Sequence, residues 1–213
     1  MNHLVLLGDS IFDNAAYVEG APAVIDQVRK HLPDDWQATL LAVDGNVANN
    51  VKTQLKRLPV DATHLALSVG GNDALGVSSH LYAPTPLPMM QALQVLSGMQ
   101  LKFQRSYELA VDNAASMGKP LLVCTIYDQV PDLPEELRTA LCLFNDVIVR
   151  VALRMGLPVL DLRAICTEAS DYAAVSPIEP SSSGGDKVAT RLVHAVLSHD
   201  FASARCRIFG GCR

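Results

Sequence analysis

Three short polar turns in this sequence carry residue types that catalytic and ligand-binding loops use. They are Gly8-Asp9-Ser10, Asp44-Gly45-Asn46 and Gly70-Gly71-Asn72-Asp73. Hydroxyl, carboxylate and amide groups of this kind can bind a polar ligand or exchange protons with it. Glycine lets the backbone of such a turn approach a ligand closely. The three turns are therefore the first candidates for a functional site.

Each of these turns follows a short apolar stretch that is typical of a β-strand. Five such stretches are present: Leu4–Leu7, Trp36–Val43, His64–Val69, Leu121–Ile126 and Val159–Leu160. Between them, apolar residues recur at helical spacing, and we expect helices near residues 22–32, 47–55, 89–117, 137–151 and 186–197. A chain that alternates strands and helices in this way forms a parallel sheet with helices on both faces.

The predicted topology brings the three turns together. The carboxyl ends of parallel strands lie on one edge of the sheet, and ligands bind there at the point where the strand order reverses. With the order 2-1-3-4-5, the loops after the first and third strands diverge and leave a crevice between Ser10 and Asn72. We expect a single domain over residues 1–200, followed by a short, basic, solvated tail over residues 201–213.

The composition is that of an ordinary globular protein. Of the 213 residues, 49% are hydrophobic and 18% are charged. The net charge of −5 argues against a surface for nucleic acid or anionic membranes, which need a positive face. No apolar run approaches the ~18 residues of a membrane span, and the absence of a basic leader leads us to expect a cytoplasmic protein. The five cysteines show no CxxC spacing, so we expect no zinc site.

The polar turns also resemble the sequence blocks of a known family. Gly8-Asp9-Ser10, within Gly-Asp-Ser-Ile-Phe-Asp-Asn, is similar to the first block of the GDSL, or SGNH, hydrolases. Gly45 matches the glycine of the second block, and Gly70-Gly71-Asn72-Asp73 matches the third. The resemblance implies a three-layer α/β/α, flavodoxin-like fold with a five-stranded parallel sheet. It also implies hydrolysis of small-molecule esters without a metal or cofactor.

The resemblance implies a role for each matched residue. Ser10 corresponds to the nucleophile, and the N–H groups of Ser10 and Gly45, with the side-chain amide of Asn72, correspond to the oxyanion hole. Loss of one such donor typically slows a reaction ~100- to 1,000-fold. Asp9 and Asp73 are then supporting residues: Asp9 holds the turn that exposes Ser10, and Asp73 tethers its loop.

The last block of the family departs from its pattern in this chain. Family members carry Asp-x-x-His, in which the histidine takes the proton of the serine and the aspartate orients the histidine. The matching stretch here is Ser176-Pro177-Ile178-Glu179-Pro180, which places Ser176 at the aspartate position and Glu179 at the histidine position. Glu179 is therefore the candidate base, with the neutral Ser176 hydroxyl as its hydrogen-bond partner. A free glutamate titrates near ~4.3, and burial would raise that pKa.

The same residues are compatible with two other functions. A fold without the family's histidine could bind an ester, an acylated sugar or a partner without turnover. It could also transfer the acyl group to an alcohol instead of water. Among the histidines of this sequence, only His80, in the loop after the third strand, is placed where it could replace Glu179 as the base.

Several other residues have a structural interpretation. Asn14 is a candidate cap for the helix that follows it. Met89-Met90 is expected in the core, and the segment Leu75–Pro88 could form a lid over the site. Gly184-Gly185 is expected to form a turn before the last helix, because no Lys-Ser or Lys-Thr pair follows it as in a phosphate-binding loop.

Overall fold

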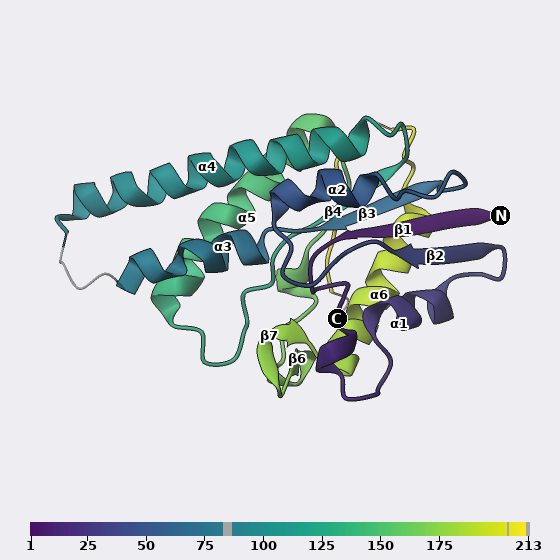
Figure 1. Ribbon diagram of the computed structural model, residues 1–213, viewed down its shortest axis with the longest axis horizontal. Helices are drawn as coiled ribbons and strands as arrows, with labels where there is room; N and C mark the ends of the chain where they lie inside the picture. The colour runs from purple at the N-terminus through teal and green to yellow at the C-terminus, as the bar shows by residue number, and fades with distance from the viewer. Residues whose placement is uncertain (83–86, 204, 212–213) are drawn as a thin grey trace.

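A six-stranded parallel sheet forms the centre of the protein (Figure 1). The structure is a computed structural model that describes residues 1–82, 87–203 and 205–211, with only the backbone of His80. The strands lie in the order β2-β1-β3-β4-β5-β8. Their bounds are β1 (Asn2–Gly8), β2 (Trp36–Leu40), β3 (His64–Ser68), β4 (Leu121–Cys124), β5 (Val159–Leu160) and β8 (Ile208–Phe209). The predicted fold class and the order of the first five strands are confirmed.

Helices cover both faces of this sheet. The first face is covered by α1 (Val24–His31) and α6 (Ser182–Ser198), and the second by α2 (Val51–Leu55), α4 (Met89–Ala115) and α5 (Glu135–Met155). The remaining elements are α3 (Gly71–Ser78), five short 3-10 helices and a small antiparallel hairpin. The 3-10 helices are η1 (Ala15–Tyr17), η2 (Ala48–Asn50), η3 (Ser79–Tyr82), η4 (Leu162–Ala164) and η5 (Ala169–Asp171). The hairpin is formed by β6 (Tyr172–Ala173) and β7 (Ser176–Pro180). Within the described ranges, no helix is both long and apolar enough to cross a membrane.

Strand β1 shows why uninterrupted apolar stretches form the buried strands. Leu4, Val5, Leu6 and Leu7 are all fully buried. Successive side chains of a strand point to opposite faces of its sheet. Accordingly, Leu4 and Leu6 belong to the core under α1 and α6, whereas Val5 and Leu7 belong to the core under α2, α4 and α5. A strand covered on both faces therefore shows no polar alternation.

The C-terminal segment is not the solvated tail that we expected from the sequence. Ile208 and Phe209 form β8, which pairs in parallel with Val159 and Leu160 of β5 as a sixth strand. The Phe209 side chain is buried in the core under α1 and α6. The prediction failed because two apolar residues between arginines and glycines are too short a pattern to reveal a strand.

The last helix begins before the glycine pair instead of after it. Ser181 caps α6 by accepting a hydrogen bond from the Gly184 N–H at 3.1 Å, so Gly184-Gly185 lies in the first turn of the helix. A Cβ atom at Gly184 would lie 2.0 Å from the Asp171 carbonyl oxygen. The pair was expected to form a turn before the helix. The structure instead shows that glycine here allows α6 to pack closely against η5.

Gly8 ends β1 in close contact with β3. Its φ of +127° is a conformation that residues with a side chain rarely adopt, and a Cβ atom would lie 1.7 Å from the Ser68 carbonyl oxygen. Because the Ser68 backbone belongs to the neighbouring strand, it cannot move away without breaking the sheet. The site therefore follows a strand end that only glycine can form.

We expect Gly8→Ala to destabilise the protein by about 4 kcal/mol or more, since both the conformation and the contact are lost. Gly118→Ala is a matched control, because Gly118 also has a positive φ (+65°) but open space where a Cβ atom would lie. Its expected cost is about 1 kcal/mol. Urea unfolding followed by circular dichroism measures both. Equal free energies of unfolding for the two variants would contradict the argument.

Candidate active site

Ser10 lies in the turn that leaves the carboxyl end of β1. The side chain of Asp9 closes this turn, because its Oδ1 atom accepts a hydrogen bond from the Ile11 N–H at 3.2 Å. Ser10 is buried, with 6% of its surface exposed, but it borders a cavity. Asp9 is also buried, and desolvation raises the pKa of its carboxyl to about 8, with the charges of Glu179 and Asp73 adding to the shift.

The loops that follow β2 and β3 are joined by side chains of the third polar turn. The Asn72 Nδ2 group donates to the Asn46 carbonyl at 3.0 Å, and the Asp73 carboxylate accepts from the Ala48 N–H at 2.9 Å. Gly45 has a φ of +76°, with open space where a side chain would lie. An amide nitrogen carries two hydrogens, so Asn72 keeps one for a ligand while it holds the Gly45 loop.

Glu179 lies on β7 and comes from the far end of the chain to meet Ser10. Only 5% of its surface is exposed, and its Oε2 atom has no hydrogen-bond partner in the described structure. Desolvation raises the pKa of this carboxyl to about 7. The nearby negative charge of Asp44 raises the pKa further, whereas hydrogen bonding with the Ser10 side chain lowers it. A carboxyl group that is half ionised near neutral pH therefore lies beside a serine hydroxyl.

Ser176 is not joined to Glu179 by any hydrogen bond that the structure describes. It begins β7 three residues before Glu179, and side chains an odd number of positions apart point to opposite faces of a regular strand. A role for Ser176 stays a prediction. The groups that act on the Glu179 carboxyl are instead Ser10 and Asp44.

The histidine side chains that the structure describes have partners away from Ser10. His3 bonds Thr39, His31 bonds Asp186, and His64 stacks on Trp36. His194 and His199 pack against Phe209 at the opposite end of α6 from Glu179. The backbone of His80 is part of η3, but its side chain lies outside the described residues, so its role as an alternative base stays a prediction.

Two residues that the sequence did not single out for the site hold the backbone on either side of Glu179. The Tyr127 hydroxyl donates to the carbonyl of Ile178 at 2.5 Å. The Asn14 Nδ2 group donates to the carbonyl of Pro180 at 3.0 Å, while its Oδ1 atom accepts from the Val24 N–H at 2.9 Å. Asn14 is therefore not the side-chain cap that we expected, because it stands at the N-cap of η1 without such a bond and the N-cap of α1 is Ala23. It instead links the first residue of α1 to β7. The sequence signal for the contact with β7 is the position of Asn14 at the end of the Gly-Asp-Ser-Ile-Phe-Asp-Asn segment.

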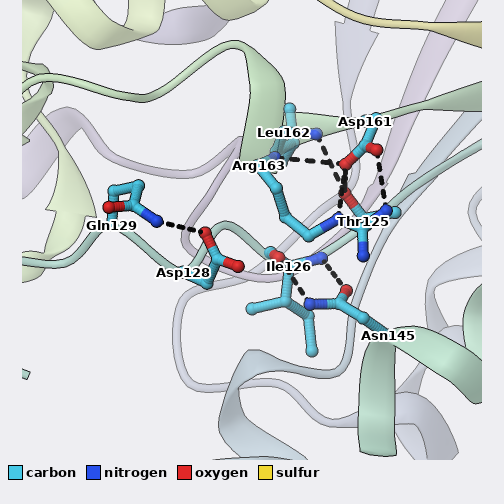
Figure 2. Close-up of polar contacts among 8 residues, drawn as sticks. All are labelled: Thr125, Ile126, Asp128, Gln129, Asn145, Asp161, Leu162 and Arg163. Carbon is cyan, nitrogen blue, oxygen red and sulfur yellow. Dashed lines mark hydrogen bonds and ion pairs between the residues drawn. The ribbon is translucent and has the colours of Figure 1, made fainter. Parts of the chain in front are cut away.

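The segment that carries Tyr127 is itself fixed by α5. Figure 2 shows the Asn145 side chain, which accepts from the Ile126 N–H at 2.8 Å and donates to the Ile126 carbonyl at 2.9 Å. In the same view, both carboxylate oxygens of Asp161 are bonded by Arg163, and Thr125 donates to one of them at 2.9 Å. Asp161 therefore holds the ends of β4 and β5 together.

A cavity of about 110 Å³ opens at Ser10 and Glu179. Asp9, Asn72 and Tyr127 also border it, and most of its remaining wall is apolar. Gly45 does not line this cavity, and its turn is linked to the site by the hydrogen bond between Asn46 and Asn72 and by the charge of Asp44 near Glu179. The arrangement combines a hydroxyl, a proton acceptor and N–H donors at the mouth of an apolar cavity.

Comparison with known proteins identifies the family and agrees with the fold. Residues 6–185 match the GDSL-like lipase/acylhydrolase family. The chain belongs to this family, whose members hydrolyse esters. No curated protein sequence matches the chain.

Several solved structures share the fold at low sequence identity. A lipase from a goat rumen metagenome superposes with a TM-score of 0.72 at 16% identity, over 92% of this chain and 97% of the other. A lipolytic protein of the G-D-S-L family from Veillonella parvula gives 0.69 at 15% identity, over 93% and 100%. An acetyl xylan esterase gives 0.66 at 18% identity, over 91% and 99%.

We expect Asp44→Asn to lower the pKa of Glu179, because it removes a negative charge that opposes ionisation of the carboxyl. The substitution keeps an oxygen that can accept the hydrogen bond from the Tyr17 hydroxyl, which lies 2.7 Å from the Asp44 carboxylate. Asp34→Asn, which neutralises an exposed aspartate, is the control. NMR titration of glutamate side chains labelled with ¹³C measures the shift. An unchanged Glu179 midpoint in Asp44→Asn would contradict the assigned cause.

Proposed function

We propose that this protein is a serine esterase in which Ser10 is the nucleophile and Glu179 is the general base. One observation carries the proposal: a desolvated carboxyl with a pKa of about 7 borders the same cavity as Ser10 and interacts with its hydroxyl. A general base works best when its pKa lies near the working pH. An ordinary glutamate is too weak a base for this task.

The proposed reaction has two halves. The Glu179 carboxylate accepts the hydroxyl proton as the Ser10 oxygen attacks the ester carbonyl carbon, and it then gives that proton to the departing alcohol oxygen. In the second half, Glu179 takes a proton from the water that attacks the acyl carbon, and it returns this proton to the Ser10 oxygen as the bond to the acyl group breaks and the acid leaves. The N–H group of Ser10 and the side-chain amide of Asn72 stabilise the oxyanion in both halves, whereas the role of Gly45 stays a prediction because Gly45 does not border the cavity.

Glu179 must be oriented differently from the family's histidine. An aspartate can hold a histidine through the ring N–H group that does not face the serine, but an ionised glutamate has no N–H group that such a partner could bind. In this chain the backbone on both sides of Glu179 is held instead, by the Tyr127 hydroxyl and the Asn14 amide. We therefore assign these two residues as positioning residues.

We expect both Ser10→Ala and Glu179→Gln to lower kcat for p-nitrophenyl esters by about 1,000-fold or more. Glu179 acts only when ionised, so kcat/KM of the wild type should rise with pH to a plateau, with a midpoint near pH 7. The measurement is the rate of p-nitrophenol release from pH 4 to 9.

Glu136→Gln is the matched control, since it removes an exposed carboxylate. Wild-type kcat and an unchanged pH profile in Glu179→Gln would show that another group is the base. Turnover that does not depend on Ser10, or no turnover of any ester in the series, would overturn the esterase proposal and favour a binding protein.

We expect Tyr127→Phe to lower kcat by about 10- to 100-fold with little change in KM, because a misplaced base slows the chemical step more than binding. Tyr172→Phe is the matched control. It is also a buried tyrosine whose hydroxyl donates to a backbone carbonyl, that of Cys166. Tyr172 packs against Tyr127 and pairs with Pro180 of β7, so the control removes a similar hydrogen bond from the same neighbourhood but leaves the bond to the Ile178 carbonyl in place. Similar losses of stability but equal kcat values in the two variants would contradict a positioning role for Tyr127.

A further inference from the structure

The cavity beside Ser10 is larger than a short acyl group requires. Its volume is about 110 Å³, whereas a single water molecule needs about 10–15 Å³ of space measured in this way. An acetyl group places only a methyl group beyond the carbonyl carbon. Most of the cavity would then stay unfilled in a complex with an acetate ester.

The charged groups of the cavity gather at its Ser10 end. Asp9 and Glu179 are its only charged lining residues in the described structure, and both lie beside Ser10. The remaining wall is formed mainly by aliphatic and aromatic side chains of α3, α4, α5 and the segment after β4. Those that matter most here are Leu75, Leu96, Met99, Leu137, Ala140 and Phe144.

One wall of the cavity is formed by apolar side chains that remain partly exposed in the folded protein. No residue of α3 is buried, although Ala74, Leu75 and Val77 line the cavity and Leu75 remains 45% exposed. The sequence from Ala74 to Leu101 contains no lysine, arginine, aspartate or glutamate. In Figure 1, α3 and the first half of α4 extend beyond the carboxyl edge of the sheet. An alkyl chain in the cavity would cover this surface.

Two expectations about this region are corrected by its geometry. Met89 and Met90 are not core residues but are 75% and 68% exposed. The α4 residues that reach the cavity are Leu96 and Met99, two turns further along. The segment expected as a lid forms part of the wall through Leu75 and Leu81, while residues 83–86 lie outside the described structure.

We propose that the cavity holds the alkyl chain of a medium-length acyl group, and that esters of such acids are preferred over acetate esters. This inference rests on the proposed serine esterase function. The acyl group, rather than the alcohol, is assigned to the cavity because it stays covalently attached to Ser10 after the alcohol leaves. A recessed apolar cavity at Ser10 therefore suits the part of the substrate that must be retained.

The test compares two series of esters. In the first, p-nitrophenyl esters run from acetate to dodecanoate, so only the acyl chain changes. In the second, alkyl acetates run from ethyl to decyl, so only the alcohol changes. Each buried methylene group is worth ~4-fold in kcat/KM, and we expect a rise of at least ~100-fold from acetate to octanoate in the first series only. A rise in the second series alone would overturn the acyl assignment, and flat profiles would overturn the proposal.

Ala140→Trp tests the cavity itself, because it places a large side chain in the cavity wall. We expect it to lower the ratio of kcat/KM for octanoate over acetate by at least ~10-fold. Thr139→Trp is the matched control, since Thr139 is the exposed neighbour on the same helix and does not line the cavity. An equal ratio in Ala140→Trp and Thr139→Trp would contradict the proposal.

Calorimetric binding of decanoate to the Ser10→Ala protein separates this inference from the esterase proposal. Binding that Ala140→Trp abolishes and Thr139→Trp retains would support the alkyl-chain site even if no ester were hydrolysed. Hydrolysis of acetate esters that depends on Ser10, without decanoate binding or a chain-length preference, would leave the esterase function standing and overturn the acyl-chain site.

Discussion

The site depends on how the buried backbone of β1 ends. Buried N–H and C=O groups need hydrogen-bond partners. At Gly8 the side-chain amide of Gln54 serves both groups, since it accepts from the N–H at 2.8 Å and donates to the carbonyl at 2.7 Å. The same amide donates to the Asn46 side chain at 2.9 Å. One buried glutamine therefore joins the strand end before Ser10 to the loop that carries Gly45, and the core fixes their relative positions.

Desolvation gives the site its chemistry and also a cost in stability. Burial raises the pKa of Asp9 to about 8 and that of Glu179 to about 7, so the folded protein holds these protons more tightly than the unfolded chain does. The stabilising contribution of each protonated carboxyl is complete at low pH and is lost as the pH rises through the raised pKa. The free energy of unfolding contributed by this pair therefore falls between about pH 4 and pH 8. The ionised Glu179 carboxylate, which the proposed mechanism requires at neutral pH, therefore lowers the stability of the folded protein.

In the proposed mechanism Glu179 takes the role that a histidine has in the family, and the surroundings of Glu179 are consistent with that role. A histidine base is oriented through its side chain by an aspartate three residues before it in sequence. Glu179 is held instead through its backbone, by Tyr127 from the end of β4 and by Asn14 from the segment after Ser10. Asn14 also bonds Val24, which links the position of β7 to the start of α1. The proposed base is thus attached to the framework that carries the proposed nucleophile.

The sequence by itself determined the fold class, the order of five strands and the edge of the sheet where the polar turns meet. Runs of apolar residues, helical spacing and turn residues are local patterns that can be read along one chain. It could not reveal β8 or α3, because two apolar residues or a helix of eight residues carry too little periodicity. Only the tertiary structure decided that Glu179 meets Ser10 and Asp44, and that Asn14 bonds Pro180 across 166 residues of sequence. The pKa of Glu179 belongs to the same category, since desolvation is set by all the atoms that surround a group and not by its neighbours in sequence.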